Sequence, residues 1–163
     1  MRQLLGMNDD ASPGPHYPAL LQLLRTAETI WNSSRLFFAR WDLSPAQFNL
    51  LNLLTDQPEG LSQSDLSREL LTHRSNITGL VDRLEKRELV RRRELADDRR
   101  AWRVVLTRSG RELMEEILPH YYRAAEVVWG GVSARRAKEV AAVLQIVAEN
   151  TERASRSLPE VRA

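Results

Sequence analysis

The residues with the clearest chemical potential are arginines, gathered in the stretch from Arg83 to Arg111. This stretch holds eleven basic and five acidic residues, so it carries +6, whereas the whole chain carries +2 and its remainder −4. Ten of the eleven bases are arginine, whose planar guanidinium forms paired hydrogen bonds with phosphate oxygens or guanine. The stretch therefore favours a surface that binds nucleic acid; the alternative is a solvated charged face.

A second set of polar residues lies on the segment that leads into this stretch. With about 100° between successive helical residues, the apolar side of that segment is formed by Ile77, Leu80, Val81 and Leu84. Hydroxyl, amide and guanidinium groups on the other sides can bond base edges or phosphates, as in a helix that enters the major groove with its N-terminus first. We predict six DNA contacts here: Thr72, Arg74, Ser75, Asn76, Thr78 and Arg83.

Gly79 lies on the exposed side of the same segment. Glycine costs roughly 1 kcal/mol in a helix interior, so its presence fits a close approach by another molecule. The alternative is a tolerated imperfection.

Beyond this helix the sequence pattern changes to that of strands. Residues 89–95 and 101–107 look extended, with residues 96–100 as the turn of a hairpin. In the second strand, Trp102, Val104 and Leu106 alternate with Arg103, Val105 and Thr107, which predicts one buried side. An arginine at the turn can enter the minor groove, where negative potential is focused. We predict this contact for Arg99 and Arg100, with Asp98 orienting Arg100; the alternative is a merely soluble turn.

The elements that must position these residues are helices with recognisable ends. Periodicity predicts a long helix over residues 17–41, and Ser44 caps a second one that stops at the breaker 56–60. Ser62 caps a short third helix. Thr72 is expected to cap the next after a very short turn, which is helix-turn-helix spacing.

The chain after the hairpin predicts two more helices. Thr107 or Ser109 begins the first, and Pro119 within it is expected to kink or interrupt it. The pair Gly130-Gly131 ends this helix, and Ser133 caps the last one.

Residue types that are missing exclude several classes of function. The chain has no Cys, which removes disulfides, thiolate catalysis and cysteine-bound zinc. Its three histidines are scattered, so we predict no metal site. Phosphate-binding glycine loops and nucleophile elbows are missing too, so we predict no enzyme and no cofactor. With no apolar run of about 18 residues and no leader pattern, we expect a cytoplasmic protein without membrane contact.

Several motifs, in their order and spacing, resemble those of the MarR family of transcriptional regulators. They are Leu61-Ser62-Gln63-Ser64-Asp65-Leu66, the segment ITGLVDRLEKRELV at 77–90, Asp97-Asp98-Arg99-Arg100, and Val104-Val105-Leu106-Thr107 with Gly110. The resemblance covers roughly residues 17–154. It implies a mainly α fold with a small β-hairpin wing, in which a winged helix-turn-helix domain joins a helical dimerisation region.

The resemblance also implies a division of the chain. Residues 44–107 would form the winged helix-turn-helix DNA-binding domain, and residues 17–42 and 108–154 the helical dimerisation region; residues 1–16 are expected to be a mobile tail. A two-fold homodimer would present two recognition helices to adjacent major grooves, so its operator would be a pseudo-palindrome. The implied function is regulation of transcription, as a repressor, through double-stranded DNA.

The resemblance assigns roles to single residues as well. Base edges or nearby phosphates would be contacted by Arg74, Ser75, Asn76 and Thr78, and Arg100 matches the wing arginine. Glu88 departs from the family, which usually has glycine there for a left-handed helix end, so this chain needs a different cap or a strained one.

A small aromatic or phenolic ligand that releases DNA is a further implication of the resemblance. Its pocket would be lined by Trp31, Arg35, Phe38, Trp41, Arg111 and His120. The alternative is that these aromatics form the dimer core and the arginines lie on the surface. For the whole protein, the alternative function is a winged-helix module that contacts proteins without reading DNA.

Overall fold

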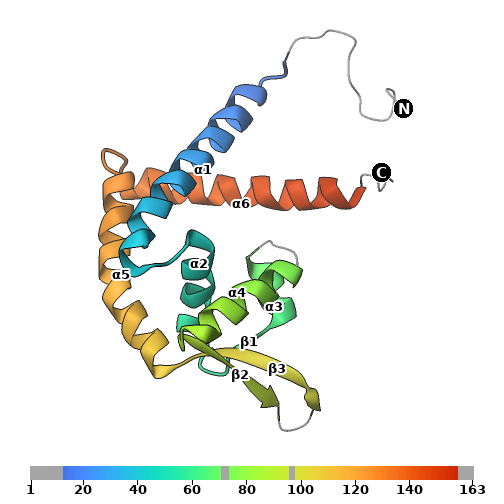
Figure 1. Cartoon of the computed structure of the whole chain (residues 1–163). Helices are drawn as coiled ribbons and strands as arrows, with labels where there is room; N and C mark the ends of the chain where they lie inside the picture. Colours follow the sequence, from blue (N-terminus) through green and yellow to red (C-terminus); the bar gives the residue numbers. More distant parts are fainter. Residues whose placement is uncertain (1–12, 71–73, 96–97, 158–163) are drawn as a thin grey trace. The chain divides into compact units, whose positions relative to one another are not determined.

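The computed structural model describes residues 13–70, 74–95 and 98–157, and at residues 74, 95 and 98–101 it describes the backbone alone. Helices predominate and a small antiparallel sheet accompanies them, which confirms the predicted fold class (Figure 1). In chain order the elements are α1 (Tyr17–Phe38), the 3-10 helix η2 (Ala39–Trp41), α2 (Pro45–Thr55), β1 (Leu61–Ser62), α3 (Gln63–Glu69), α4 (Arg74–Lys86), β2 (Val90–Leu95), β3 (Asp98–Leu106), α5 (Arg108–Val128) and α6 (Ala134–Ser157).

The helices α2 and α3 begin at the predicted caps. The Ser44 side chain accepts from the backbone N–H of Gln47, whose side chain accepts in return from the Ser44 N–H, a full capping box. Ser62 and Asp65 form a second box at the start of α3. The Ser62 hydroxyl donates to the Asp65 carboxylate at 2.6 Å, and this bond lowers the pKa of Asp65. Because these bonds are local, they fix where each helix starts.

In the part of the chain that forms α2, α3, α4 and the sheet, the hydrophobic core lies between α2, α4 and the sheet. On α4, the predicted apolar side is buried: Ile77, Leu80, Val81 and Leu84. Helix α4 contacts α2 and β2. The buried residues of α2 and the strands include Phe48, Leu50, Leu51, Leu54, Val90, Val104 and Leu106. Burial of this side of α4 leaves its polar side facing solvent.

The sheet corrects three details of the predicted hairpin. Strand β3 lies between β2 and the two-residue β1, and β1 has no counterpart among the predicted elements. The turn predicted over 96–100 is too long, because β3 begins at Asp98, opposite Leu95. The alternation places Val105 on the exposed side, yet Val105 is buried. The turn at Gly60 covers it so closely that a methyl group on Gly60 would come within 2.6 Å of the Val105 side chain.

The chain divides into two compact units, Met1–Met114 and Glu115–Ala163, with the boundary inside α5. Thr107 accepts a hydrogen bond from the first turn of α5, so Thr107 rather than Ser109 is the cap. Helix α5 continues through Pro119, which therefore does not interrupt it. Ser133 caps α6 as predicted. Within the described ranges, no helix combines the length and the apolar character needed to cross a membrane.

A left-handed residue, Glu88, closes the C-terminal end of α4 with a φ of +56°. The N–H of Leu89 donates to the Leu84 carbonyl at 3.0 Å, and the N–H of Glu88 donates to the Glu85 carbonyl at 2.9 Å. These two bonds define a Schellman motif. The sequence left open whether Glu88 takes a different cap or a strained one, and the chain uses the strained cap. The left-handed conformation costs roughly 1–2 kcal/mol for a residue that has a side chain.

We expect Glu88→Gly to be more stable than Glu88→Ala by roughly 1 kcal/mol in free energy of unfolding. Both substitutions remove the carboxylate, but only glycine relieves the left-handed backbone, and the larger entropy of glycine in the unfolded chain offsets part of this gain. Urea unfolding followed by circular dichroism measures the difference. Equal free energies of unfolding for the two variants would contradict the strain at this cap.

Candidate nucleic-acid interface

The N-terminal half of α4 exposes small polar side chains. Ser75, Asn76 and Thr78 are exposed there, and Arg83 is exposed further along the helix. Thr72 lies outside the described residues, and Arg74 is described by its backbone alone, as the first residue of α4. The structure thus places four of the six predicted contacts on the accessible surface of one helix.

Thr78 has a structural partner as well as an exposed position. The side-chain amide of Gln63 donates to the Thr78 hydroxyl. Because Gln63 is the first residue of α3, this bond joins the start of α3 to the middle of α4. It helps to fix the angle between the two helices of the helix-turn-helix.

Gly79 lies beside the guanidinium of Arg83 on the exposed side of α4. A methyl group built on Gly79 would lie 3.5 Å from Nη1 of Arg83, which is an ordinary contact with the end of a flexible side chain. Internal packing therefore does not explain glycine at this position. A close approach by another molecule and a tolerated imperfection remain the two explanations.

Much of the basic stretch is bound within the protein. Six of its arginines donate to acceptors in the chain: Arg87, Arg92, Arg93, Arg103, Arg108 and Arg111. Arg93 donates to the Glu59 carboxylate at 2.6 Å, and Arg103 donates to the carbonyl of Gly60 at 3.0 Å. Both strands of the hairpin are thereby fixed to the turn before β1. The excess charge of the stretch therefore overstates the cations that are available to a ligand.

Arg87 shows why arginine suits such internal positions. Its Nη2 donates to the carbonyl of Trp41 at 3.1 Å, and its Nη1 donates to the carbonyl of Asp42. Carbonyls at a helix end lack partners within the helix, and the forked guanidinium satisfies two of them at once. Arg87 thus links the end of α4 to the connection between α1 and α2.

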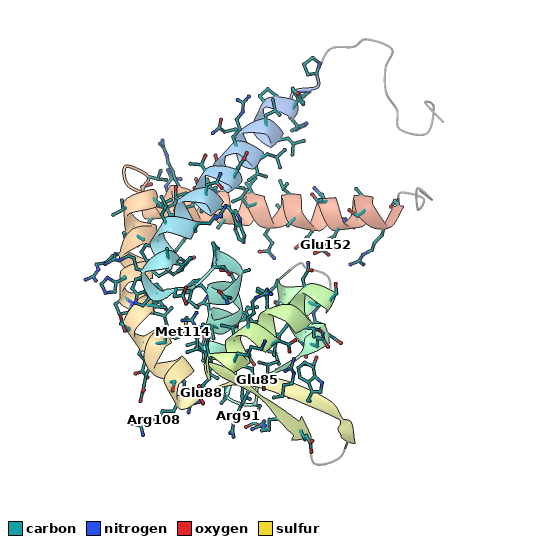
Figure 2. The ribbon with its side chains drawn as sticks, viewed as in Figure 1. Glu85, Glu88, Arg91, Arg108, Met114 and Glu152 are labelled. Atoms are coloured by element: carbon teal, nitrogen blue, oxygen red, sulfur yellow. The ribbon has the colours of Figure 1, made fainter. Side chains whose placement is uncertain are left out.

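Three exposed bases of the stretch have no partner in the part of the chain that the structure describes: Arg83, Lys86 and Arg91. Arg83 and Lys86 lie on α4. Arg91, which is labelled in Figure 2, lies on β2. The side chains of Asp98, Arg99 and Arg100 are outside the described residues, and their backbone forms the first part of β3.

The aromatic residues predicted for a ligand pocket differ in their surroundings. Phe38 is buried, and its ring stacks on that of Phe48 with 4.2 Å between centroids, so Phe38 belongs to the core. Trp31 and Arg35 are exposed on α1, and Trp41 is half-buried. Phe38 therefore packs within a single chain, and neither the pocket nor the dimer core is decided by its position.

The remaining two pocket candidates have internal partners. Arg111 is exposed, and its Nη1 donates to the carbonyl of Leu106 at 3.0 Å. His120 belongs to the second unit and bonds through Nδ1 to Arg123 at 3.0 Å. The pocket itself stays a prediction.

Comparison with known proteins identifies the family. The family model described as MarR family matches residues 41–101. The transcriptional repressor MprA of Escherichia coli K12 is 34% identical over 84 residues, 52% of this chain and 48% of MprA, so the match spans about half of that relative. The HTH-type transcriptional repressor NicR of Pseudomonas putida is 30% identical over 112 residues, 69% of this chain and 70% of NicR. This chain belongs to the MarR family.

Solved structures share the fold of this MarR-family chain. The S. aureus MepR–DNA complex superposes with a TM-score of 0.72 at 21% identity, covering 82% of this chain and 97% of MepR. Bordetella bronchiseptica BpsR, whose DNA binding is regulated by 6-hydroxynicotinic acid, superposes with a TM-score of 0.75 at 23% identity, covering 85% and 98%. The named sequence relatives are transcriptional regulators rather than enzymes, which agrees with the predicted class.

In this MarR-family protein, we expect Gly79→Ala to raise the free energy of unfolding by roughly 1 kcal/mol, because alanine is the better helix former. If DNA lies against Gly79, the same variant will bind duplex DNA more weakly although it is more stable. Thermal unfolding and fluorescence anisotropy with a labelled duplex measure the two effects. Greater stability with unchanged DNA affinity would identify Gly79 as a tolerated imperfection.

Proposed function

We propose that this chain is a sequence-specific transcriptional repressor that binds a pseudo-palindromic site in double-stranded DNA as a homodimer. The observation that carries the proposal is the exposed side of α4, which offers the hydroxyl and amide groups of Ser75, Asn76 and Thr78 and has no acid before Asp82. The names of MprA and NicR support repression, and the MepR–DNA complex supports a duplex as the partner.

In the proposed complex, α4 enters the major groove with its N-terminal end first, where the helix dipole favours phosphate. The contacts to base edges and adjacent phosphates come from Thr72, Arg74, Ser75, Asn76, Thr78 and Arg83. The hairpin of β2 and β3 follows the neighbouring minor groove, with Arg99 and Arg100 inserted and Asp98 orienting Arg100. Lys86 and Arg91, both exposed, add phosphate contacts.

A second copy of the chain is the proposed partner in the homodimer. Along one side of α1, the exposed apolar residues are Tyr17, Leu20, Leu24 and Trp31. Along α6 they are Val140, Val143, Leu144 and Ile146. Exposed apolar surface of this extent is unusual on a soluble monomer. A two-fold dimer formed by residues 17–42 and 108–154 would cover it and present two α4 helices to adjacent major grooves.

A small aromatic or phenolic ligand is proposed to release the DNA. The residue types suited to an anionic aromatic compound are the rings and cations of the predicted set: Trp31, Arg35, Phe38, Trp41, Arg111 and His120. The likeness to BpsR, which responds to a hydroxylated aromatic acid, supports this class of ligand. If these residues are only dimer core and surface, hydroxylated aromatic acids will leave DNA affinity unchanged.

We expect Arg100→Ala to weaken binding to the preferred duplex by roughly 1–3 kcal/mol while the protein stays folded. Titrations at several salt concentrations, followed by anisotropy, measure the affinity and its salt dependence. Arg156→Ala, near the end of α6, removes the same charge outside the proposed interface and serves as the control. Unchanged affinity in Arg100→Ala would contradict the minor-groove contact of Arg100. If the wild-type protein shows no preference among DNA sequences, the alternative function, a winged-helix module that contacts proteins, would be favoured.

Asn76→Ala and Ser75→Ala are expected to change the preferred sequence more than the general affinity for DNA. Side chains that contact base edges give specificity, whereas phosphate contacts give affinity. Selection of bound duplexes from a random pool measures the preference, and binding to a scrambled duplex measures the general affinity. If the variants select the same sequences as the wild type, these two residues do not read bases.

A further inference from the structure

An ion-pair cluster joins α4 to the hairpin of β2 and β3. Arg92 lies on β2, an edge strand of the sheet, and its Nη2 donates to Oδ1 of Asp82 at 2.5 Å. Its Nη1 donates to Oε2 of Glu85, and its backbone N–H donates to Oε1 of the same carboxylate at 3.0 Å. Figure 2 shows Glu85 on α4 near the base of the hairpin. Both the main chain and the side chain of Arg92 are therefore held by α4.

Trp102 of β3 completes this cluster. Arg92 pairs with Val104 and Trp102 pairs with Glu94 across the hairpin, so Arg92 and Trp102 are diagonal neighbours on one side of the sheet. The Arg92 guanidinium lies over the indole, 4.8 Å from the ring centroid, which is a cation–π arrangement. A single side chain thus contacts both the helix and the second strand of the hairpin.

The cluster is better suited to fixing geometry than to adding stability. Burial opposes the charged guanidinium, but the bonds and charges of Asp82 and Glu85 outweigh it and raise the pKa of Arg92. The three side chains remain 28% (Arg92), 49% (Asp82) and 36% (Glu85) exposed, and ion pairs at such sites contribute little stability. The cluster has two carboxylates and one guanidinium, so its net charge is negative. A surface whose only role is to attract phosphate would not carry a negative net charge.

We propose that Arg92 is a positioning residue that holds the hairpin in a fixed orientation to α4, so that both grooves are contacted in one register. The inference rests on the proposed function, which assigns the major groove to α4 and the minor groove to the hairpin. Arg92 contacts no base in this arrangement and acts through the backbone of β2 and β3. A loosely held hairpin must be ordered when DNA binds, and this cost weakens binding most at the site where both contacts form.

Arg92→Gln removes the guanidinium that forms the link, and Glu85→Gln weakens the link by removing one of its two carboxylates, so the two variants change the net charge in opposite directions. Their affinities are measured for a duplex that the wild-type protein selects from a random pool, and for a scrambled duplex of the same composition. We expect affinity for the scrambled duplex to fall in Arg92→Gln and to rise in Glu85→Gln. The ratio of selected to scrambled affinity is expected to fall in both variants, by about tenfold.

Arg93→Gln is the matched control for charge. It removes the same charge from the next position on β2. Arg93 ties β2 to Glu59 in the turn before β1 and not to α4, so its loss leaves the link between α4 and the hairpin intact, and we expect its affinity ratio to stay within about twofold of wild type. Ratios that move in opposite directions in Arg92→Gln and Glu85→Gln would show a purely electrostatic role and overturn the proposal. An equally large fall in Arg93→Gln would overturn it too.

Hydrogen exchange without DNA separates this inference from the proposed function. If Arg92 positions the hairpin, the amides of β2 and β3 exchange faster in Arg92→Gln and Glu85→Gln than in Arg93→Gln, while the amides of α2 stay protected. Unchanged exchange overturns the positioning role. A different result would be faster exchange in the two variants together with a wild-type protein that binds both duplexes equally. That result would support the link between α4 and the hairpin and would overturn the proposed function instead.

If Arg92→Gln does not fold, Arg92→Lys is used in its place for the same two measurements. Lysine retains the positive charge but lacks the planar fork that bonds two carboxylates at once. We therefore expect an affinity ratio between those of the wild type and Glu85→Gln, together with faster exchange in the hairpin. A wild-type ratio and wild-type exchange in a folded Arg92→Lys would overturn the role of the fork.

Discussion

The burial of one side of α4 is the constraint on which the rest of the structure depends. Ile77, Val81 and Leu84 are fully buried, and a helix that buries one side must present the opposite side to solvent. The rotation of α4 about its axis is therefore set by packing, and Ser75 and Asn76 are exposed as a consequence. The capping box of α3 and the bond to Thr78 then set the position of the neighbouring helix. The packing of α4 alone is therefore sufficient to expose the residues of the candidate interface.

Arginine serves two different purposes in this chain, and net charge alone does not distinguish them. Where an arginine faces carbonyls or carboxylates, as Arg87 and Arg103 do, its fork satisfies acceptors that the backbone leaves open. Where it faces solvent, as Arg83 and Arg91 do, its charge is available to phosphate. The net charge of the basic stretch counts both kinds of arginine together. Among the internal arginines, Arg92 is the one whose bonds join the hairpin to α4.

Sequence reasoning succeeded where the determining interactions are local. The caps at Ser44 and Ser62 and the apolar period of α4 involve residues three or four positions apart, and the structure has them as predicted. It failed where the partner lies far along the chain. The burial of Val105 depends on the turn at Gly60, and the bond from Arg87 to Trp41 joins residues 46 positions apart. Such pairings have no periodic signal, so only a three-dimensional structure reveals them.

The distribution of acids along α4 links these observations. Residues 74–81 include no acid, whereas residues 82–88 include Asp82, Glu85 and Glu88. Negative charge at a helix N-terminus would normally be favourable, so its exclusion from the first half of α4 is not explained by helix stability. It is explained if that end must accept phosphate from outside the chain. Two of the acids in the second half have a structural role instead, because the carboxylates of Asp82 and Glu85 bind Arg92. One helix thus has an exposed N-terminal half without acids and a C-terminal half whose acids Asp82 and Glu85 orient the hairpin.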